Sequence, residues 1–286
     1  MRDFAGKVAV ITGAAGGLGK ALARRFARAG MKLVLADLDS AALASARAEL
    51  ESAGAAAIAV RTDVRKAADV EALAARTLEV YGAVHMVCNN AGVAPVGAAW
   101  ESTAADWEWV LGVNLWGVIH GVRVFTPIML GQGEAGHIVN TASVAGLIAP
   151  PGMGAYNVSK HAVVALTESL HHDLVARGAG IRCTVVCPAY FPSGIADSER
   201  ARPAELAEPG RARTDAQRAL EANLRQAVMA GKLSADDVAA AVLEAVRDER
   251  FYVLTHPRIK PAIEWRMRDI LEERAPTDPM RGPQGG

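Results

Sequence analysis

A tyrosine and a lysine four residues apart are the first candidates for chemistry. Tyr156 and Lys160 lie in a stretch with helical character, where residues four apart share one helix face. An ammonium group within about 4–6 Å of a phenol favours the phenolate, so we expect the pKa of Tyr156 to lie below its usual value of about 10. Such a phenol is suited to acid–base catalysis near neutral pH.

A glycine-rich turn follows the first predicted strand. The segment Thr12-Gly13-Ala14-Ala15-Gly16-Gly17-Leu18-Gly19 leads directly into a predicted helix. A strand, a glycine turn and a helix N-terminus together present backbone N–H groups and a partial positive charge to an anion. Three of these glycines, at positions 13, 17 and 19, would let the backbone approach a pyrophosphate closely. The alternative is a plain tight turn in a chain rich in glycine and alanine.

An aspartate at the end of the second predicted strand indicates which dinucleotide binds. Asp37 follows Gly13 by 24 residues, where an acid in a dinucleotide-binding fold accepts hydrogen bonds from the adenosine ribose. Its carboxylate would repel a 2′-phosphate, and positions 14–19 and 38 hold no arginine or lysine. We therefore expect NAD as the cofactor rather than NADP. The neighbouring Asp39 is typical of a loop or helix-capping residue.

The elements that position these residues alternate along the chain. Strands are expected at Lys7–Thr12, Lys32–Ala36, Ala57–Arg61, Val84–Cys88, His137–Thr141, Ile181–Val186 and Phe251–Leu254, and helices near 17–29, 40–53, 66–81, 104–126, 155–177, 234–248 and 259–274. The strands are continuous apolar runs, which indicates a parallel sheet covered on both faces. This predicts one α/β domain over residues 1–274, a Rossmann-like doubly wound sheet of about seven strands. A (β/α)₈ barrel is the alternative, but seven strands and the early glycine turn favour the open sheet.

Residues 192–232 interrupt this alternation. The segment is rich in Pro, Arg and Glu and then turns helical, with Leu220, Leu224 and Val228 on one face. An excursion this long is typical of a functional loop, so we expect a substrate lid. Its basic residues alternate with acids, which favours a solvated, self-neutralised surface around Arg200, Arg202, Arg211 and Arg213. The alternative is that these arginines bind an anionic tail of the substrate. The last residues, 275–286, are expected to form a disordered tail.

Helix ends carry their own signals. Ser40 and Ser234 are expected N-caps, and Gly30 and Gly54 are expected just past the ends of two helices.

Composition excludes several classes of protein. The 286 residues include 31 basic and 31 acidic side chains, and this balance argues against a nucleic-acid binder. A hydrophobic content of 51% argues against a disordered chain. The N-terminus has no signal-peptide layout, and the longest uncharged stretch, 138–159, is broken by polar residues and prolines, so no membrane association is expected.

Cysteine and histidine usage completes these expectations. Cys183 and Cys187 would lie about 13 Å apart on a strand, too far for a disulfide, so we expect a reducing, cytoplasmic location. His171 and His172 are adjacent on a predicted helix, point about 100° apart and lack an accompanying ligand cluster, so no metal site is expected.

Taken together, the motifs resemble the short-chain dehydrogenase/reductase family. The Thr12–Gly19 turn is followed, in that family's order, by Asp63-Val64, Asn89-Asn90-Ala91-Gly92, Asn114, Ser143 and the Tyr156/Lys160 pair. The resemblance is close over roughly residues 5–190 and looser beyond them.

The resemblance implies a role for each matched residue. Tyr156 would exchange a proton with the substrate oxygen, and Ser143 would donate a hydrogen bond to that oxygen. Lys160 would lower the pKa of Tyr156 and bind the nicotinamide ribose, while Asn114 would hold a water that links Lys160 to solvent. The cofactor would be bound by Gly13, Gly16, Gly17, Leu18, Gly19, Asp37, Leu38, Asp63, Val64, Asn90, Ala91, Gly92, Tyr156, Lys160, Pro188 and Ser193. Among these, Asp63 would meet the adenine ring, and Asn90 would fix the adjoining strand and the cofactor.

One segment departs from the family pattern. The family usually has Pro-Gly and then a threonine for the nicotinamide carboxamide, whereas this chain has Pro188-Ala189-Tyr190-Phe191-Pro192-Ser193. Ser193 keeps a hydroxyl at the threonine position, but Ala189 and Pro192 put the conformation of this loop in doubt.

The predicted substrate pocket is mainly apolar. Its walls are expected from Val93, Pro95, Ser143, Ala145, Leu147, Met153, Tyr190 and Phe191. The resemblance and this pocket imply an NAD-dependent oxidoreductase that interconverts a lipophilic secondary alcohol and its ketone. Two alternatives stay open: an epimerase or dehydratase that recycles NAD on the same fold, and a catalytically silent NAD-binding regulatory protein. Family members associate through helices, so a homodimer or homotetramer is expected.

Overall fold

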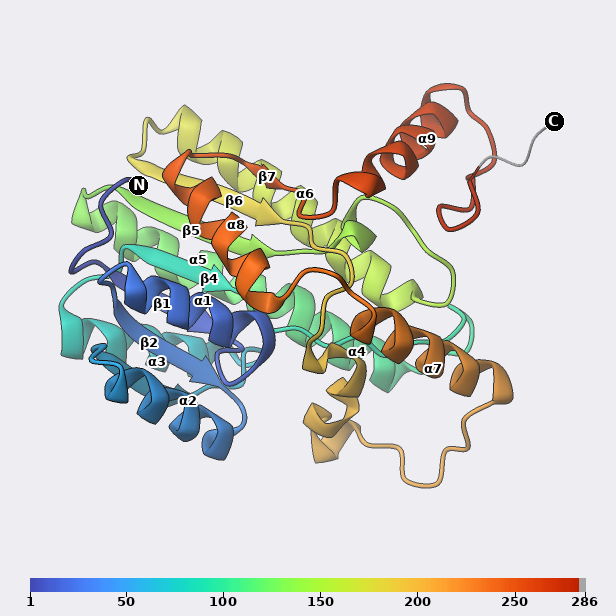
Figure 1. The fold of residues 1–286 in the computed structure, drawn as a ribbon, viewed down its shortest axis with the longest axis horizontal. Helices are drawn as coiled ribbons and strands as arrows, with labels where there is room; N and C mark the ends of the chain where they lie inside the picture. Colours follow the sequence, from blue (N-terminus) through green and yellow to red (C-terminus); the bar gives the residue numbers. More distant parts are fainter. Residues whose placement is uncertain (283–286) are drawn as a thin grey trace.

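The fold is a seven-stranded parallel sheet with helices on both faces. The computed structural model describes residues 1–282 of the chain, and Figure 1 shows its course. The strands are β1 (Val8–Thr12), β2 (Lys32–Asp37), β3 (Ala57–Arg61), β4 (Met86–Asn89), β5 (Gly136–Thr141), β6 (Ile181–Val186) and β7 (Tyr252–Val253). Their order in the sheet is β3-β2-β1-β4-β5-β6-β7. The predicted single-domain, Rossmann-like doubly wound sheet is confirmed, and the barrel is excluded.

Crossover helices cover this sheet because parallel strands need long connections. The helices are α1 (Gly17–Arg28), α2 (Ser40–Ser52), α3 (Ala67–Tyr81), α4 (Ala104–Leu111), α5 (Gly117–Gln132), α6 (Gly154–Ala176), α7 (Asp215–Met229), α8 (Ala235–Arg247) and α9 (Lys260–Leu271). Apolar side chains of α1, α2 and α8 pack in the core cluster on one face of the sheet, and those of α3, α5 and α6 pack in the cluster on the other. The buried strands therefore read as continuous apolar runs.

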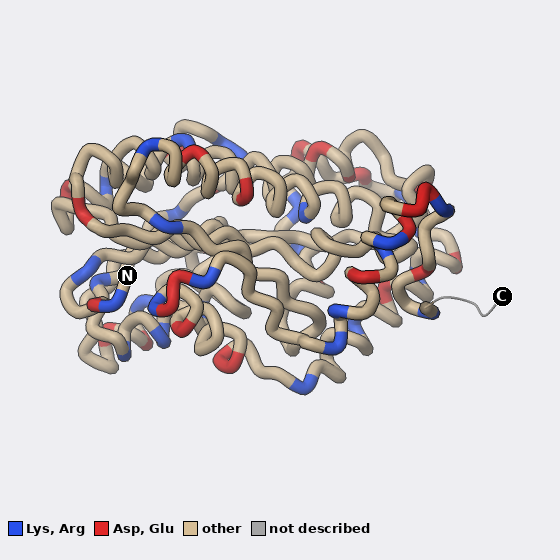
Figure 2. Tube along the Cα trace, turned by 90° about the horizontal axis from the view of Figure 1, so that it is seen from above, with Lys and Arg blue, Asp and Glu red and all other residues tan. Residues whose placement is uncertain are grey.

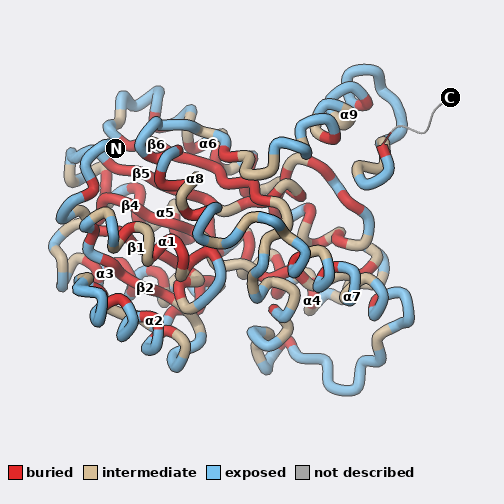
Figure 3. The backbone as a smooth tube through the Cα atoms, viewed as in Figure 1, coloured by how far each residue is buried: buried red, intermediate tan, exposed pale blue. Residues whose placement is uncertain are grey.

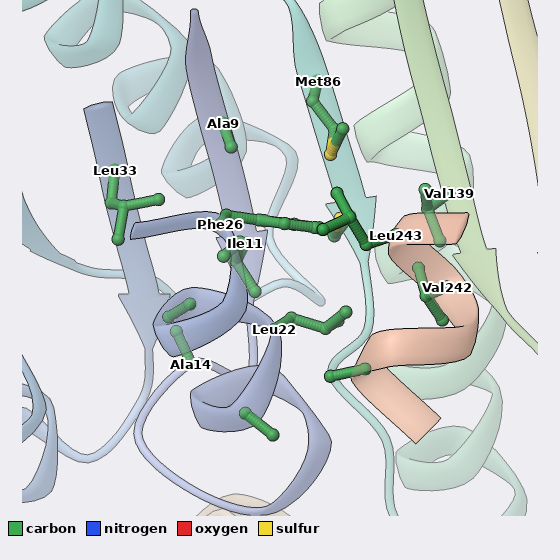
Figure 4. Close-up of a cluster of buried hydrophobic side chains, with 14 of the residues drawn as sticks. Ala9, Ile11, Ala14, Leu22, Phe26, Leu33, Met86, Val139, Val242 and Leu243 are labelled. Atoms are coloured by element: carbon green, nitrogen blue, oxygen red, sulfur yellow. The ribbon is translucent and has the colours of Figure 1, made fainter. Parts of the chain in front are cut away.

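One half of the core lies between β1 and the pair α1 and α8. Leu22 and Phe26 of α1 meet Val242 and Leu243 of α8 above the strands, as Figure 4 shows. Phe26 is fully buried. This packing fixes α1 against the sheet, so it also fixes the glycine turn at its N-terminus.

Helix ends agree with the sequence signals except at one position. Gly30 and Gly54 have positive φ values of 80° and 83° just after α1 and α2, as predicted. Ser234 caps α8 as predicted. The N-cap of α2 is Asp39 and not Ser40, because the Asp39 carboxylate accepts the N–H groups of the first turn.

A π-helical turn joins α4 to α5. The helix predicted for 104–126 extends to Gln132, and residues Gly112–Trp116 (η1) form the π turn within it. By length and hydropathy this segment could span a membrane. Here it packs against the sheet with Trp109, Phe125 and Met129 buried, as does the core helix of a globular domain.

The predicted lid folds into short 3₁₀ turns and a helix. Turns η3 (Gly194–Ala201) and η4 (Ala204–Leu206) precede α7, which carries the predicted apolar stripe. Figure 3 shows that the stretch between η4 and α7 and most of α9 are exposed, in contrast to the buried sheet. Acidic and basic residues are interspersed over the outer helices and loops in Figure 2.

The segment predicted as a disordered tail differs from that expectation over residues 275–282. There the Thr277 N–H donates to Asp269 at 2.7 Å, and Gly282 lies against Trp265. Residues 283–286 lie outside the described part of the chain.

Candidate active site

A cavity of about 560 Å³ opens at the carboxyl ends of the strands. This is the edge where parallel α/β sheets bind ligands. Fifteen of the sixteen predicted cofactor residues line it, namely Gly13, Gly16, Gly17, Leu18, Asp37, Leu38, Asp63, Val64, Asn90, Ala91, Gly92, Tyr156, Lys160, Pro188 and Ser193. Of the predicted pocket residues, Val93, Ser143, Ala145, Met153, Tyr190 and Phe191 also line it.

The N-terminus of α1 forms an anion cradle. Its N-cap, Gly16, makes no side-chain cap, and the first turn holds no acidic residue. Gly13 has φ +67°, and a Cβ there would lie 2.9 Å from the Cα of Ala91. Nothing lies within 4 Å of the Cβ position at Gly16. The cradle therefore offers uncapped N–H groups and open space to a phosphate, which fits a dinucleotide.

Gly19 supports the cradle through close packing but does not line the cavity. A Cβ at this position would lie 2.0 Å from the carbonyl oxygen of Gly13 and 2.8 Å from the Asn90 side-chain amide. The predicted contact between Gly19 and the cofactor is therefore wrong, because the residue packs under the turn. Its role is the close helix–strand packing that glycine allows.

Two aspartates stand at the adenosine end of the cavity. Asp37 accepts the N–H of Ala15 at 3.0 Å and that of Asp39 at 3.1 Å, which fixes its carboxylate at the end of β2. Asp63 pairs with Arg65, whose guanidinium donates at 3.0 and 2.7 Å. Burial alone would raise the pKa of Asp63, but the Arg65 bonds outweigh it and lower that pKa.

Lys160 is fixed by the backbone of β5. Its Nζ donates to the carbonyl of Thr141 at 2.8 Å, and the side chain is only 3% exposed. Nζ lies 5.6 Å from the centre of the Tyr156 ring. The helix thus places both groups on one face, as the spacing of the two residues predicts.

The pKa of Tyr156 departs from the prediction. Burial raises the pKa of Tyr156 to about 12, although the Ser143 hydroxyl opposes this rise. Burial also lowers the pKa of Lys160 to about 8, so its ammonium is itself less favoured. This direction differs from the lowering that the spacing of Tyr156 and Lys160 predicts, because desolvation of the phenol is the largest effect on its pKa.

Asn114 is buried and lies behind the cavity wall. Its side chain accepts the Val93 N–H at 2.8 Å and donates to the Val93 carbonyl at 2.9 Å and to the Ser159 hydroxyl at 3.1 Å. These bonds hold α6 to the segment that follows β4. The Asn114 side chain is thereby committed to partners within the protein.

Ser143 is hydrogen-bonded to the loop that follows β6. Its hydroxyl donates to the Pro188 carbonyl at 3.4 Å and accepts the Ala145 N–H at 3.1 Å. The Val144 N–H donates to the same Pro188 carbonyl at 3.0 Å. Ser143 therefore lies on the cavity wall with Tyr156, which brings an orienting hydroxyl and a proton-exchanging phenol together.

Asn90 fixes two strands, as the resemblance implied. Its side-chain amide donates to the Thr12 carbonyl at 3.0 Å, and its oxygen accepts the Thr141 hydroxyl at 3.3 Å. The Thr12 hydroxyl in turn accepts the N–H groups of Asn90 and Ala91 at 2.9 and 3.1 Å.

Two predicted pocket residues face elsewhere. Leu147 packs against the apolar cluster of Val118, Ala142 and Val163. Pro95 lines a separate cavity between the lid and the body. Neither residue lines the main cavity, although Ile148, the neighbour of Leu147 in the chain, does.

Several cavity residues escaped the sequence reasoning. Among them are Ile195, Ser198, Leu224, Val228, His256, Arg258 and Met280. Leu224 and Val228 had a signal in the helical stripe of the lid. His256, Arg258 and Met280 had none, since they reach the cavity only through the path of the chain after β7.

The lid is attached by a network of arginines and carboxylates. Asp106 of α4, only 7% exposed, pairs with Arg202 at 2.6 Å and with Arg211 at 2.7 Å. Arg202 also lies over the Trp109 ring at 4.2 Å. The predicted self-neutralised set holds for Arg202, Arg211 and Arg213.

Arg200 differs from the other lid arginines. It lines the cavity and makes no ion pair with any residue within 1–282, so the predicted neutralised surface is wrong at this position.

The three cysteines lie in the interior of the domain. Cys88, Cys183 and Cys187 are free and buried. Within residues 1–282, no three His, Cys, Asp or Glu side chains gather as metal ligands.

Comparison with known proteins decides the family. Residues 7–204 match the family model described as short chain dehydrogenase. This chain belongs to the short-chain dehydrogenase/reductase family. It is therefore an oxidoreductase, as the resemblance implied.

The alignments with similar proteins extend over most of this short-chain dehydrogenase. A short-chain dehydrogenase/reductase from Burkholderia phymatum, solved in complex with NAD, is 55% identical, covers 100% of both chains and superposes with a TM-score of 0.96. A CLA biosynthesis dehydrogenase/reductase of Lactiplantibacillus plantarum is 37% identical over 96% of this chain and 97% of its own length. A 1-deoxy-11-beta-hydroxypentalenate dehydrogenase of Streptomyces exfoliatus is 38% identical over 87% of this chain and 83% of its own.

Proposed function

We propose that this short-chain dehydrogenase uses NAD to interconvert a lipophilic secondary alcohol and its ketone. One observation carries the proposal: Ser143 and Tyr156 line the same cavity as the glycine cradle and Asp37. A substrate oxygen between the hydroxyl and the phenol would therefore place its carbon beside a dinucleotide bound along the cradle.

The chain's own residues supply proton transfer and orientation. When bound, NAD supplies the hydride acceptor for oxidation and, in its reduced form, the hydride donor for reduction. Tyr156 takes the hydroxyl proton of the alcohol in oxidation and returns a proton to the ketone oxygen in reduction. The Ser143 hydroxyl donates a hydrogen bond to that oxygen, and Lys160 holds a cationic centre behind the phenol.

The residues of the cavity fit an apolar substrate. Beyond Ser143 and Tyr156, much of the substrate side is formed by Val93, Ala94, Ala145, Ile148, Met153, Phe191, Ile195, Leu224 and Val228. Burying apolar surface of a ligand against such walls contributes about 25 cal/mol per Å². The names of two relatives, a 1-deoxy-11-beta-hydroxypentalenate dehydrogenase and a 3beta-hydroxysteroid dehydrogenase, support a hydroxyl on a cyclic skeleton.

Preference for NAD follows from the fixed carboxylate of Asp37. Two N–H groups hold it at the end of β2, where it would accept the ribose hydroxyls and repel a 2′-phosphate. The NAD complex of the Burkholderia phymatum relative supports this cofactor.

Replacement of Asp37 tests the cofactor directly. Asp37→Ala should raise the KM for NAD by about tenfold and narrow the preference over NADP, because a charge-assisted bond is lost and the repulsion disappears. Steady-state kinetics with both cofactors measure this. A wild-type enzyme that already prefers NADP would contradict the proposal.

A screen of lipophilic secondary alcohols tests the reaction. The proposal predicts net formation of NADH, followed by its absorbance, with at least one cyclic or aromatic alcohol. Substrate conversion without net NADH would indicate the recycling epimerase or dehydratase. Tight NADH binding with no conversion across the panel would indicate a silent NAD-binding protein.

We also propose a homodimer or homotetramer formed through the helices around α5 and α6. Trp116 is 51% exposed on η1 and Val158 is 50% exposed on α6, and large apolar side chains on a surface are typical of an interface. Light scattering after size-exclusion chromatography measures the assembly, and a monomer would contradict it.

A further inference from the structure

The ladder between β6 and β7 continues beyond the end of β7 through a side chain. The Val185 N–H donates to the Phe251 carbonyl at 2.8 Å, and the Cys187 N–H donates to the Val253 carbonyl at 2.9 Å. The next N–H in this alternation belongs to Ala189. It donates to Nδ1 of His256 at 3.2 Å.

The imidazole replaces a backbone acceptor that the ladder would otherwise use. If the pairing continued two residues at a time, the Ala189 N–H would donate to the carbonyl of Thr255. The chain, however, turns into a 3₁₀ element (Pro257–Ile259) just after Thr255. The Thr255 hydroxyl lies 2.8 Å from the same Nδ1. Nε2 of His256 is buried and has no hydrogen-bond partner within residues 1–282.

The loop 188–193, held in this way, runs from Ser143 to the glycine cradle. Its Pro188 carbonyl accepts the bonds from Ser143 and Val144 described above. At its other end, the Cβ of Ser193 lies 3.7 Å from the Cβ position of Gly17 at the start of α1. The loop therefore spans the cavity from the orienting hydroxyl to the phosphate site.

We propose that His256 is a positioning residue, whose neutral imidazole fixes the loop 188–193 over the dinucleotide by accepting the Ala189 N–H. Ala189 stands where the family pattern has a glycine, and its backbone N–H is anchored from the turn that follows β7. His256 does not touch the reacting atoms, so it acts through Pro188 and Ser193. The proposal rests on the proposed function only in taking NAD as the ligand.

The proton must then lie on Nε2, because an acceptor Nδ1 carries none. Tyr190 from the facing loop and Arg258 from the same segment line the cavity together with His256. Burial lowers the pKa of His256, and the Tyr190 backbone opposes this lowering only in part. The imidazole therefore stays neutral at physiological pH, and protonation on acidification removes the acceptor.

Three variants test the proposal on the full-length protein. In His256→Asn the side-chain oxygen reaches about the place of Nδ1, whereas in His256→Gln the amide reaches about that of Nε2. His256→Ala leaves the Ala189 N–H without a partner, which should raise the NADH dissociation constant, measured by fluorescence, by about tenfold. His256→Gln should behave like His256→Ala, and His256→Asn should recover most of the affinity. The KM for NAD should rise in the same order, with kcat changed less than threefold.

Hydrogen exchange gives a readout that does not depend on the cofactor. The Ala189 amide should exchange at least tenfold faster in His256→Ala than in the wild type and should be protected again in His256→Asn. Equal NADH affinity and equal Ala189 exchange in all variants would overturn the proposal, as would recovery by Gln and not by Asn. If the wild type binds no NADH, the proposed function fails, while the exchange result still decides the role of His256.

Discussion

The cradle and the lid handle charge in opposite ways. At the cradle, an anion site is built without any charged side chain: α1 begins at glycines, and its first turn has no acid and no side-chain cap. In the lid, charged side chains pair with each other, with Asp106 between Arg202 and Arg211 and Glu199 beside Arg202. The cradle leaves its backbone N–H groups free to bind an anionic ligand. The lid instead uses its charged side chains to attach itself to the body of the domain.

The difference explains how a chain of zero net charge can bind a dinucleotide. Backbone N–H groups and a helix dipole act within the first turn, so they need no global positive field. Arginine–carboxylate pairs are directional, so they fix the position of the segment 192–232 against α4. Ligand binding at the cradle therefore depends on open space around the glycines, whereas attachment of the lid depends on its ion pairs.

The largest effect is expected where space is removed from the cradle. Gly19→Ala would place a Cβ 2.0 Å from the Gly13 carbonyl, so the turn must move. We expect at least a hundredfold loss of NADH affinity and a loss of about 3 kcal/mol in the free energy of unfolding. Gly131→Ala in α5 is the matched control, because nothing lies within 4 Å of its Cβ position and the residue does not line the cavity. NADH titration and urea unfolding measure both variants, and equal affinity in the two would break the comparison.

A smaller effect is expected where charge is removed from the lid. Asp106→Asn leaves the guanidiniums of Arg202 and Arg211 without their shared carboxylate, which should cost about 2 kcal/mol of lid attachment. Limited proteolysis within the exposed segment 207–214 should become about tenfold faster, while NADH affinity changes less than threefold. Asp215→Asn is the control, because its pair with Arg218 is fully exposed and such pairs contribute little. Loss of NADH binding in Asp106→Asn would show that the two regions are not separable.

The smallest effect is expected from acidification. Burial would raise the pKa of Asp106 and of Glu199, but their arginine partners outweigh it and lower both pKa values in the folded chain. The stability that these carboxylates contribute is therefore complete above their unfolded pKa of about 4 and is lost as the pH falls through the lower folded values. Proteolysis of 207–214 should be constant from pH 7 to 5 and rise severalfold below pH 4. A rise already between pH 7 and 6 would contradict this assignment.

Much of the fold was predictable because its signals are local. Apolar runs of five or six residues and the glycine turn after β1 specify a parallel sheet, and the observed strands differ from the predicted bounds by at most two residues at either end. The alternation of strands and helices left few topologies to choose from. The π turn around Asn114 carried no such signal, since it depends on how α4 and α5 pack against the sheet.

The site residues that belong to motifs were predictable from the sequence. The residues that reach the cavity only because of the three-dimensional course of the chain were not. Tyr156, Lys160 and Ser143 meet because two neighbouring elements end at the same edge of the sheet. The pKa of Tyr156 was predicted in the wrong direction because burial cannot be read from spacing. His256 and Arg258 could not be foreseen, since the turn after β7 alone brings them to the cavity.

One measurement tests the central claim most directly. Tyr156→Phe removes the hydroxyl that exchanges the proton and leaves the ring, the cradle and Lys160 in place. We predict that NADH affinity stays within threefold of the wild type while kcat for the best alcohol falls by about 10²–10⁴-fold. Retention of wild-type turnover by Tyr156→Phe would contradict the account.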